Sequence, residues 1–264
     1  MDRRLQAMQQ TALDRMSAQQ CADIHCHCLP GLDDGPRNTQ EALALCEALV
    51  EDGITTVVAT PHQLGRFDGR CDARSIKEAV AQLNADLSLA GIPLEVLPGA
   101  EVRVDERLLD LLAQDKVQTL PGDCLMLELP FEVFLDVGPL LRALGEAGIR
   151  TVIAHPERNA GIAADPARCL AWSDSDPVLQ VTAASLVGAL GPGVREAAWR
   201  LLDLPMTAVV ATDAHDTGDR SPCFAGAFGA VRQKKGIRFA KQVFVDNPWH
   251  VVGAGSARKT LSRG

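Results

Sequence analysis

Residues 23–35 read DIHCHCLPGLDDG, and this stretch predicts both the first strand of the fold and a metal site. Residues two apart in an extended strand point the same way, so the imidazoles of His25 and His27 should face one side. A Pro-Gly pair then turns the chain into a loop with two adjacent carboxylates, Asp33 and Asp34, whose oxygens suit divalent cations. A His-x-His pair alone is weak evidence, because histidines on a half-buried strand are about as often core residues as ligands. Its meaning depends on where the other histidines fall.

Beyond this stretch, short β-branched or apolar runs alternate with segments of helical spacing. Parallel strands buried on both faces show such continuous apolar runs, so the pattern predicts an α/β fold. The 264 residues contain no evident linker, and this length suits a single α/β barrel. The expected strands are 21–25, 54–60, 93–98, 124–129, 150–154, 177–183 and 207–212, and the expected helices are 39–52, 72–90, 105–114, 136–147 and 194–203.

Composition excludes several classes of protein. A net charge of −8 argues against a nucleic-acid-binding protein, because such binding depends on Lys and Arg that neutralise phosphates. No apolar run approaches the roughly 18 residues that cross a bilayer, and the N-terminus lacks a secretory signal core, so we expect a cytoplasmic protein that does not insert into membranes. The eight cysteines are scattered, which favours reduced thiols. Cys26 and Cys28 alternate with His27 and should face the core.

Ionisable side chains collect at the carboxyl ends of the predicted strands. Five of the six histidines lie in or just beyond such an end, and only His250 does not. In a closed barrel these ends converge on one face, where barrels carry their chemistry. Carboxylates packed so closely repel one another and raise their pKa values unless cations hold them ionised. The set is larger than one ion needs and predicts two or three ions, with candidate ligands His25, His27, Asp34, His62, Glu101, Glu128, His155, Asp213 and His215.

Several short motifs recur in order along the chain: DIHCH, DDGP at 33–36, ATPH at 59–62, GAE at 99–101, AHPER at 154–158 and DAH at 213–215. Together they resemble the PHP (polymerase and histidinol phosphatase) superfamily. More closely, they look like the bacterial tyrosine-protein phosphatases of capsular and exopolysaccharide operons, the CpsB/YwqE type. The resemblance covers residues 21–250. It leaves residues 1–20 as an N-terminal extension, with helical spacing over 3–18, and residues 251–264 as a C-terminal tail.

This resemblance implies a distorted, TIM-like barrel of seven β/α units and three metal ions, usually manganese, with zinc, iron or magnesium as alternatives. Arg158 and Arg220 match positions that the family uses to hold phosphate, for which a planar guanidinium is suited. Alternatively, Arg158 is a surface residue that pairs with Glu157. The implied ligand sets are His25, His27, Glu101 and Asp213 for one ion, Glu101, Glu128 and His155 for a second, and Asp34, His62 and His215 for a third.

The implied reaction is hydrolysis of phosphotyrosine by a hydroxide that bridges two ions, because metal binding lowers the pKa of water. The ions and arginines would neutralise the phosphate oxygens. A phenolate, whose phenol has a pKa near about 10, leaves with little protonation. Asp33 and Asp213 are candidates for assisting a proton. The implied partner is the phosphotyrosine tail of a polysaccharide-assembly tyrosine kinase; this chain contains no Tyr and cannot be its own substrate.

Other functions are weighed against this one. A cysteine-dependent phosphatase needs Arg six positions after its Cys, and none of the eight cysteines has one. An amidohydrolase also begins with His-x-His, but its binuclear form commonly uses a carbamylated Lys at the strand end where this chain has Glu128. A histidinol-phosphate or other small-molecule phosphatase stays open, while the acidic balance counts against a polymerase-associated nuclease. The intact ligand set argues against a non-catalytic scaffold that partners a membrane kinase.

Overall fold

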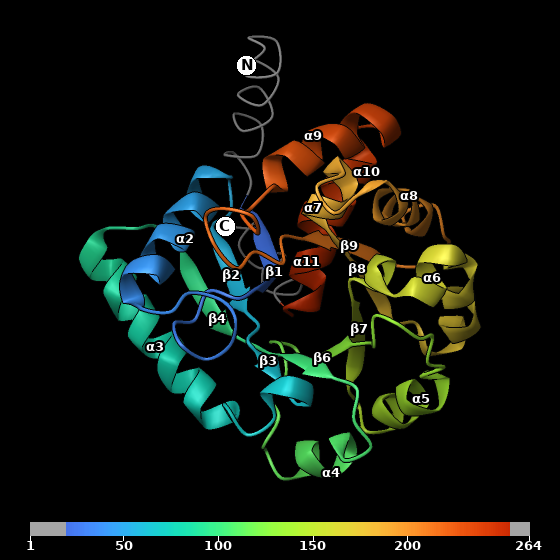
Figure 1. The fold of residues 1–264 in the computed structure, drawn as a ribbon, viewed down its shortest axis with the longest axis horizontal. Coiled ribbons are helices and arrows are strands. Elements are labelled where there is room, and N and C mark those ends of the chain that lie inside the picture. The colour runs from blue at the N-terminus through green and yellow to red at the C-terminus, as the bar shows by residue number, and fades with distance from the viewer. Residues whose placement is uncertain (1–19, 254–264) are drawn as a thin grey trace, which may run out of the picture.

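The computed structural model describes residues 20–253, and its strands alternate with helices as predicted (Figure 1). The helical pattern over 3–18 lies outside the described residues. Most strands are only four or five residues long and almost completely buried, as expected of a sheet covered on both faces. The strands are β1 (Ala22–Cys26), β2 (Thr56–Ala59), β3 (His62–Gln63), β4 (Glu95–Pro98), β5 (Glu101–Arg103), β6 (Cys124–Glu128), β7 (Arg150–Ala154), β8 (Val178–Thr182) and β9 (Ala208–Ala211).

The strands form two parallel sheets, in the orders β1-β2-β4 and β3-β5-β6-β7-β8-β9. The two sheets are connected by the chain itself, because after a short interruption β2 continues into β3 and β4 continues into β5. At the second break a Cβ atom on Gly99 would lie 2.6 Å from Cγ1 of Val58, so only glycine lets the two strands approach this closely. If β2–β3 and β4–β5 are each counted as one interrupted strand, the nine strands of the described chain form the seven strand positions of a distorted barrel.

The first and last strands of the barrel, β1 and β9, meet at a seam that differs from the other strand pairs. No regular ladder links these strands, but Cys26 and Ala214 form an isolated parallel bridge. There the His27 amide donates to the Ala214 carbonyl at 2.9 Å, and the Asp213 amide donates to the His25 carbonyl at 2.8 Å. Both bonds lie at the carboxyl end of the barrel, so the seam fixes three residues of the predicted site, His25, His27 and Asp213, relative to one another.

Helices surround the strands and cover their outer face (Figure 1). Asn38 caps the first described helix, since its side chain accepts from the Glu41 amide. Short 3₁₀ segments cover Gly65–Phe67, Pro156–Arg158 and Pro166–Ser175, and Gln242–Asp246 forms a π-helical turn. The α-helices are α2 (Thr39–Glu51), α3 (Ala73–Ala90), α4 (Leu108–Ala113), α5 (Gly138–Glu146), α6 (Ala160–Ala164), α7 (Ala183–Val187), α8 (Pro192–Leu201), α9 (Phe224–Lys235), α10 (Ile237–Lys241) and α11 (Asn247–Val251).

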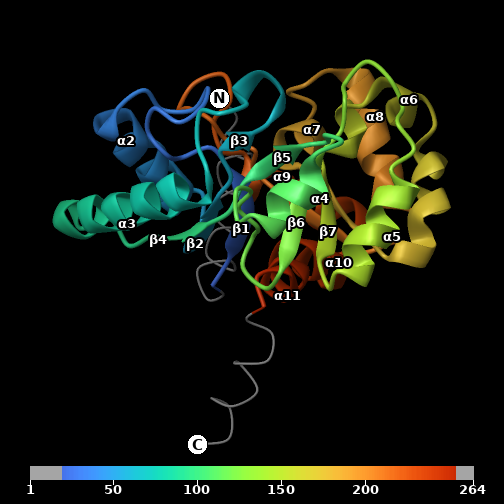
Figure 2. The ribbon, with the colours of Figure 1, turned by 90° about the horizontal axis from the view of Figure 1, so that it is seen from below.

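Two apolar layers stabilise the barrel. The larger lies between the strands and the surrounding helices, and it includes Cys26 and Cys28, which face the core as predicted. The smaller fills the interior of the barrel and contains Leu120 together with Val251 and Val252. The latter two residues belong to the chain at and just after α11, which lies below the strands at the amino end of the barrel (Figure 2). All eight cysteines are free thiols, in agreement with the sequence prediction.

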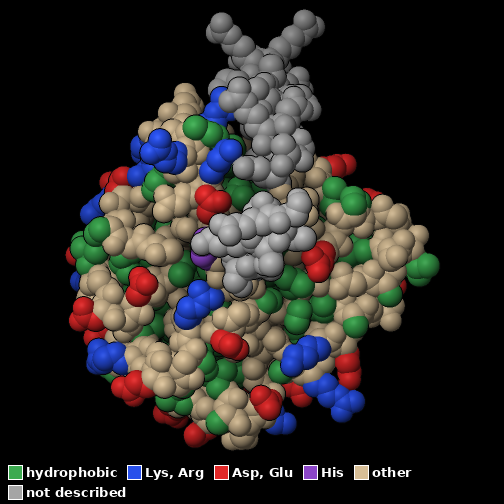
Figure 3. Space-filling view, turned by 180° about the vertical axis from the view of Figure 1, so that it is seen from behind, with side chains coloured by type: hydrophobic (Ala, Val, Ile, Leu, Met, Phe, Trp, Pro, Cys, Tyr) green, Lys and Arg blue, Asp and Glu red, His purple; other side chains and the backbone are tan. Residues whose placement is uncertain are grey.

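On the face seen in Figure 3, basic and acidic side chains are interspersed among polar and apolar ones. Within residues 20–253, no helix combines the length and the apolar character that crossing a membrane requires.

Candidate metal centre

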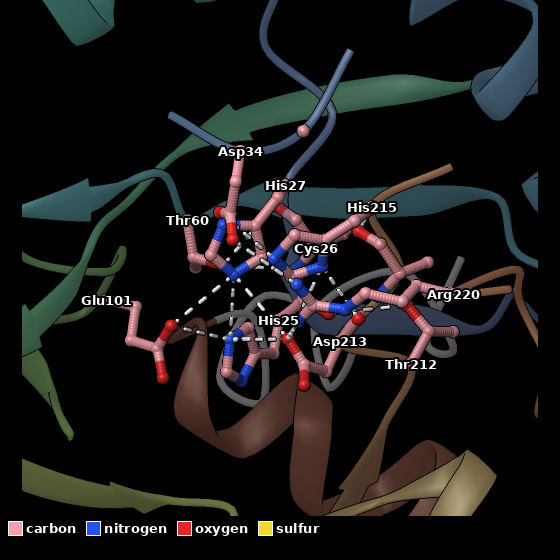
Figure 4. Close-up of polar contacts among 12 residues, drawn as sticks. His25, Cys26, His27, Asp34, Thr60, Glu101, Thr212, Asp213, His215 and Arg220 are labelled. Atoms are coloured by element: carbon pink, nitrogen blue, oxygen red, sulfur yellow. Dashed lines mark hydrogen bonds and ion pairs between the residues drawn. The ribbon is translucent and has the colours of Figure 1, made fainter. Parts of the chain in front are cut away.

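The side chains predicted as ligands converge at the carboxyl end of the barrel. Figure 4 shows several of them pointing toward one another from elements that are distant in the sequence. Because parallel strands of a barrel all end at the same rim, a side chain at each strand end can reach the common centre. The strands supply His25 (β1), His62 (β3), Glu101 (β5) and Glu128 (β6), and the loops after β1, β7 and β9 supply His27, Asp34, His155, Asp213 and His215.

Glu101 lies at the middle of this group and is fully buried. Its Oε1 atom is 2.6 Å from Nε2 of His155. Its Oε2 atom lies 3.0 Å from Nδ1 of His62 and 3.4 Å from Nε2 of both His25 and His27, yet makes no hydrogen bond. A buried carboxylate oxygen that makes no hydrogen bond and faces three imidazole nitrogens is an arrangement that a cation between these atoms would stabilise. The residues present therefore fit a divalent metal ion.

His215 carries a second unpaired atom. Its Nδ1 atom is 3.0 Å from the Asp213 carbonyl oxygen, so the proton of the neutral ring lies on Nδ1. The Nε2 atom is buried, makes no hydrogen bond and lies 3.4 Å from Oδ1 of Asp34. Burial and the neighbouring His27 lower the pKa of His215 to about 4, which keeps the Nε2 lone pair available to a cation.

Groups behind the first histidines fix their orientation. Nδ1 of His27 is 2.5 Å from Oδ2 of Asp33, and Nδ1 of His25 is 2.9 Å from Oε1 of Gln180. Each ring thereby directs Nε2 inward, and the two Nε2 atoms are 3.2 Å apart. Carboxylate and amide partners of this kind orient metal-binding histidines in general. The Asp33 loop depends on Gly35, where a Cβ atom would lie only 2.2 Å from the His27 carbonyl oxygen.

The donor atoms form three overlapping groups, each with all its atoms within 4.8 Å of one another. Two groups share atoms of Glu101, and two share His27, so the groups are neighbours and not separate sites. His250, which the sequence places away from strand ends, lies in the exposed part of α11. The groups are His25, His27 and Glu101; His62, Glu101 and Glu128; and His27, Asp34, His62 and His215.

Positive charge from imidazoles outweighs the expected repulsion between carboxylates. Burial favours the neutral form of Glu101, but His25 and His155 hold its pKa well below the ordinary value. Burial likewise favours neutral His62, but Asp34 and Glu101 raise its pKa to about 10. A metal ion bound to the His62 ring would displace its proton.

A cavity of about 560 Å³ opens above the ligand cluster. Both predicted phosphate-binding arginines line it, and both contact Asp213: Arg158 Nη1 is 2.6 Å from Oδ2, and Arg220 Nη2 is 3.5 Å from Oδ1. The alternative in which Arg158 pairs with Glu157 is wrong. Glu157 is completely buried, and its Oε1 atom instead accepts from the Thr182 amide and the Ser185 hydroxyl, each at 2.8 Å.

Several residues of the site escaped the sequence analysis. Gln180 orients His25 and also accepts from the His155 amide at 3.0 Å, and its polarity within a fully buried strand was the available signal. The cavity wall also includes two arginines and two aromatic residues that no motif indicated, because their roles depend on how loops far apart in the sequence meet. They are Arg66, Phe67, Arg103 and Phe131.

A ligand centre of this kind at the carboxyl end of an α/β barrel defines the class of metal-dependent barrel hydrolases. Comparison with known proteins narrows the class. The chain belongs to the capsular polysaccharide synthesis family CpsB/CapC, whose family model matches residues 21–253.

Individual relatives support this assignment. The tyrosine-protein phosphatase YwqE of Bacillus subtilis is 34% identical over 201 residues, which cover 75% of this chain and 79% of the relative. The tyrosine-protein phosphatase CpsB of Streptococcus pneumoniae is 26% identical over 239 residues, covering 87% and 97%. A solved structure from work on YwqE and CpsB, described as metal-dependent tyrosine phosphatases, superposes with a TM-score of 0.83 at 30% identity, covering 88% of this chain and 94% of the other.

Proposed function

We propose that the protein is a metal-dependent protein-tyrosine phosphatase that uses manganese. The observation that carries the proposal is the buried Oε2 atom of Glu101, which makes no hydrogen bond and faces three imidazole nitrogens beneath an arginine-lined cavity. Curated relatives named as tyrosine-protein phosphatases support the reaction. Mixed imidazole and carboxylate ligands suit manganese, and zinc, iron or magnesium are the alternatives that metal analysis would reveal.

Nine residues are proposed as metal ligands, in three sets, two of which share Glu101. When bound, the cations would supply Lewis acidity and lower the pKa of a water molecule toward neutrality. Asp33 is assigned to orient His27, because its two oxygens already accept from that ring and from the amides of His62 and Gly35. The sets are His25, His27, Glu101 and Asp213; Glu101, Glu128 and His155; and Asp34, His62 and His215.

Arg158 and Arg220 are proposed to bind the non-bridging oxygens of the phosphate. Asp213 contacts both guanidinium groups and so positions them on one side of the cavity, with N–H donors left for a ligand. Such preorganised donors stabilise the charge that develops on a phosphoryl group during transfer. Asp213 lines the cavity, whereas Asp33 is held behind His27; Asp213 is therefore the better placed of the two carboxylates to handle a proton.

The proposed partner is the phosphotyrosine tail of a bacterial tyrosine kinase of polysaccharide synthesis, in keeping with the capsular family. The catalytic unit is proposed to span residues 21–250, between an N-terminal extension, 1–20, and a tail, 251–264, whose first residues pack into the barrel. Eight free cysteines support a reducing location, the cytoplasm.

A comparison of rates tests the substrate. The purified protein, loaded with manganese, is assayed on a phosphotyrosine peptide, a phosphoserine peptide and histidinol phosphate, before and after chelation. We expect the phosphotyrosine peptide to be hydrolysed fastest, with activity lost on chelation and restored by manganese. Histidinol phosphate faster by orders of magnitude would contradict the substrate assignment and leave the metal centre in place. The amidohydrolase alternative is disfavoured because no lysine lines the described cavity.

A further inference from the structure

Phe131 forms part of the cavity wall directly beside the proposed phosphate-binding arginine. It follows β6 and lines the same cavity as Arg158 and Glu128. Its ring centre is 4.8 Å from Cζ of Arg158 and 5.7 Å from the ring centre of His155. The side chain is only partly buried, so it contacts the protein and still presents apolar surface to whatever enters the cavity.

The loop that carries Phe131 is held in place by the segment that follows Arg158. The Asn159 side chain is buried, and its Nδ2 atom donates to the carbonyl oxygens of Pro130 and Val133. The Ala160 amide donates to the Phe131 carbonyl at 2.7 Å. One segment therefore sets the positions of both the guanidinium and the aromatic ring, and a wall fixed in advance costs little entropy when a ligand binds.

A second aromatic ring lines the same cavity. Phe67 stacks on His62, with ring centres 4.8 Å apart and an interplanar angle of 11°, while the ring centre of Phe131 is 5.7 Å from that of His155. These two histidines contact different oxygens of Glu101. The leaving group of an ester whose phosphate reaches the buried ligands therefore has aromatic rings in the cavity wall to contact.

The recessed position of the ligands favours a long leaving group. Glu101 and His155 are buried, whereas Arg66 at the rim has 69% of its side chain exposed. A phosphoserine carries its phosphate one carbon from the backbone, which would bring the peptide against the rim. A phosphotyrosine inserts a phenyl ring between backbone and phosphate, and aromatic rings prefer stacked or edge-to-face contact with other rings.

We infer that Phe131 is a specificity-determining residue that contacts the phenyl ring of the substrate while Arg158 holds the phosphate. This inference rests on the proposed function and deepens it, because it assigns the selection of aryl over alkyl phosphate esters to a particular side chain. The contact acts on binding of the leaving group and leaves the phosphate-binding groups unchanged.

The test uses the full-length, manganese-loaded protein and two ligands that are not turned over. Calorimetry measures binding of a peptide with phosphonomethyl-phenylalanine, which mimics phosphotyrosine, and of inorganic phosphate. Phe131→Leu should weaken binding of the peptide by about 5- to 10-fold, the scale of an aromatic contact, and leave phosphate binding unchanged. Phe131→Tyr keeps the ring and should retain wild-type affinity for both ligands.

Phe134→Leu is the matched control, since Phe134 lies in the same loop but stacks on Trp172 with ring centres 5.8 Å apart. It should change neither affinity. In turnover of the phosphotyrosine peptide, Phe131→Leu should raise KM with little change in kcat. Equal weakening of peptide and phosphate would show that Phe131 only positions Arg158, and no weakening of either would also overturn the inference. Absence of phosphotyrosine turnover by the wild-type protein would instead overturn the proposed function itself.

Discussion

The two ends of the barrel are built from the same strands but differ in whether their buried polar groups are hydrogen-bonded within the protein. At the amino end, Val251 and Val252 pack into the interior, and the Arg150 guanidinium donates to the carbonyl oxygens of Gly122, His250 and Val251 at 3.0–3.2 Å. At this end the apolar side chains pack together and the carbonyl oxygens are hydrogen-bonded. The carboxyl end instead buries imidazoles and carboxylates, and it leaves ligand atoms without partners. One end is complete by itself, and the other is completed by something that binds.

This difference divides stability from chemistry. Unpaired polar atoms in a buried site cost free energy, so the carboxyl end should destabilise the fold until cations bind. A ligand that binds only the folded state adds stability that grows with the logarithm of its concentration once this exceeds its Kd. Substitutions at the carboxyl end should therefore change activity and metal-linked stability, whereas those elsewhere should change intrinsic stability alone.

The largest expected effect comes from His27→Ala. His27 belongs to two of the three ligand groups, so its loss should lower kcat/KM on a phosphotyrosine peptide by about 10³-fold or more, as expected when a catalytic metal site supplying several kcal/mol is broken. The variant should also lose the rise in melting temperature that manganese causes. His250→Ala, at an exposed histidine outside the site, should keep both properties. A fully active His27→Ala protein would refute the ligand assignment.

Arg158→Ala should have the next largest effect. Removing one preorganised donor that stabilises transition-state charge lowers kcat by about 10²–10³-fold. Metal binding should persist, because Arg158 donates to Asp213 and does not itself supply a ligand atom. Steady-state kinetics and metal analysis measure the two properties, and Arg168→Ala is the control, since that arginine lies over Phe134 outside the cavity. Unchanged kcat in Arg158→Ala would remove this residue from phosphate binding.

The same contrast explains how much the sequence could predict. The alternation of apolar runs predicted all seven strand positions of the barrel, because strand and helix periodicity are local properties. The ligand histidines could be found because each lies in or just beyond a strand end, which a barrel brings to one rim. Gln180 gave only the weak signal of a polar residue in a buried strand, and Phe131 gave none, since their partners, His25 and Arg158, are remote in sequence. The interruptions between β2 and β3 and between β4 and β5 were likewise not predicted from the sequence.

Local capping was only partly predictable. The helix expected over 39–52 does begin at Thr39, but the side chain that caps it is that of Asn38, although Thr39 could also have served as a cap. Both residue types cap helices, and their order along the chain does not decide between them. The pairing of Glu157 was similarly ambiguous, because a carboxylate beside an arginine suggests an ion pair, whereas the fold turns Glu157 into the core toward Ser185.

At the other end of the comparison, Leu120→Ala should lower stability and spare catalysis. Leu120 is 1% exposed inside the barrel, and truncating a buried leucine costs about 2–5 kcal/mol in the free energy of unfolding. Urea unfolding of the metal-free protein measures this cost, and kcat below the unfolding transition should stay within about twofold of wild type, because no cavity-lining residue is removed. Leu89→Ala, at a position 88% exposed, should leave stability unchanged. A large loss of kcat in Leu120→Ala would contradict the claim that substitutions away from the carboxyl end change stability and not catalysis.

The smallest expected effect is a pH dependence far from the metal centre. The Asp52 carboxylate accepts from the Phe224 and Ala225 amides at the start of α9, yet burial raises its pKa to about 6. A raised carboxyl pKa means that the contribution to stability is full below pH about 4 and is lost as pH rises through about 6. Between pH 4.5 and 7.5 the wild-type protein should lose on the order of 1–2 kcal/mol more than Asp52→Asn does.

Urea unfolding of both proteins at the two pH values gives this difference directly. The amide of the variant can accept only one of the two bonds, so its absolute stability falls, but the change with pH is what reports the titration. Parallel pH curves for the two proteins would show that Asp52 does not titrate in this range. Phosphatase activity of the variant at pH 7.5 should match that of the wild type.

The central claim is that the carboxyl end of the barrel holds divalent cations among its histidines and carboxylates. Anomalous diffraction from crystals grown with manganese, recorded at the manganese edge, tests it most directly. The account predicts strong anomalous peaks in the space bounded by Glu101, His25, His27 and His62, with further density near Asp34 and His215. A well-ordered crystal with manganese bound elsewhere, or with no anomalous peak among these residues, would contradict it.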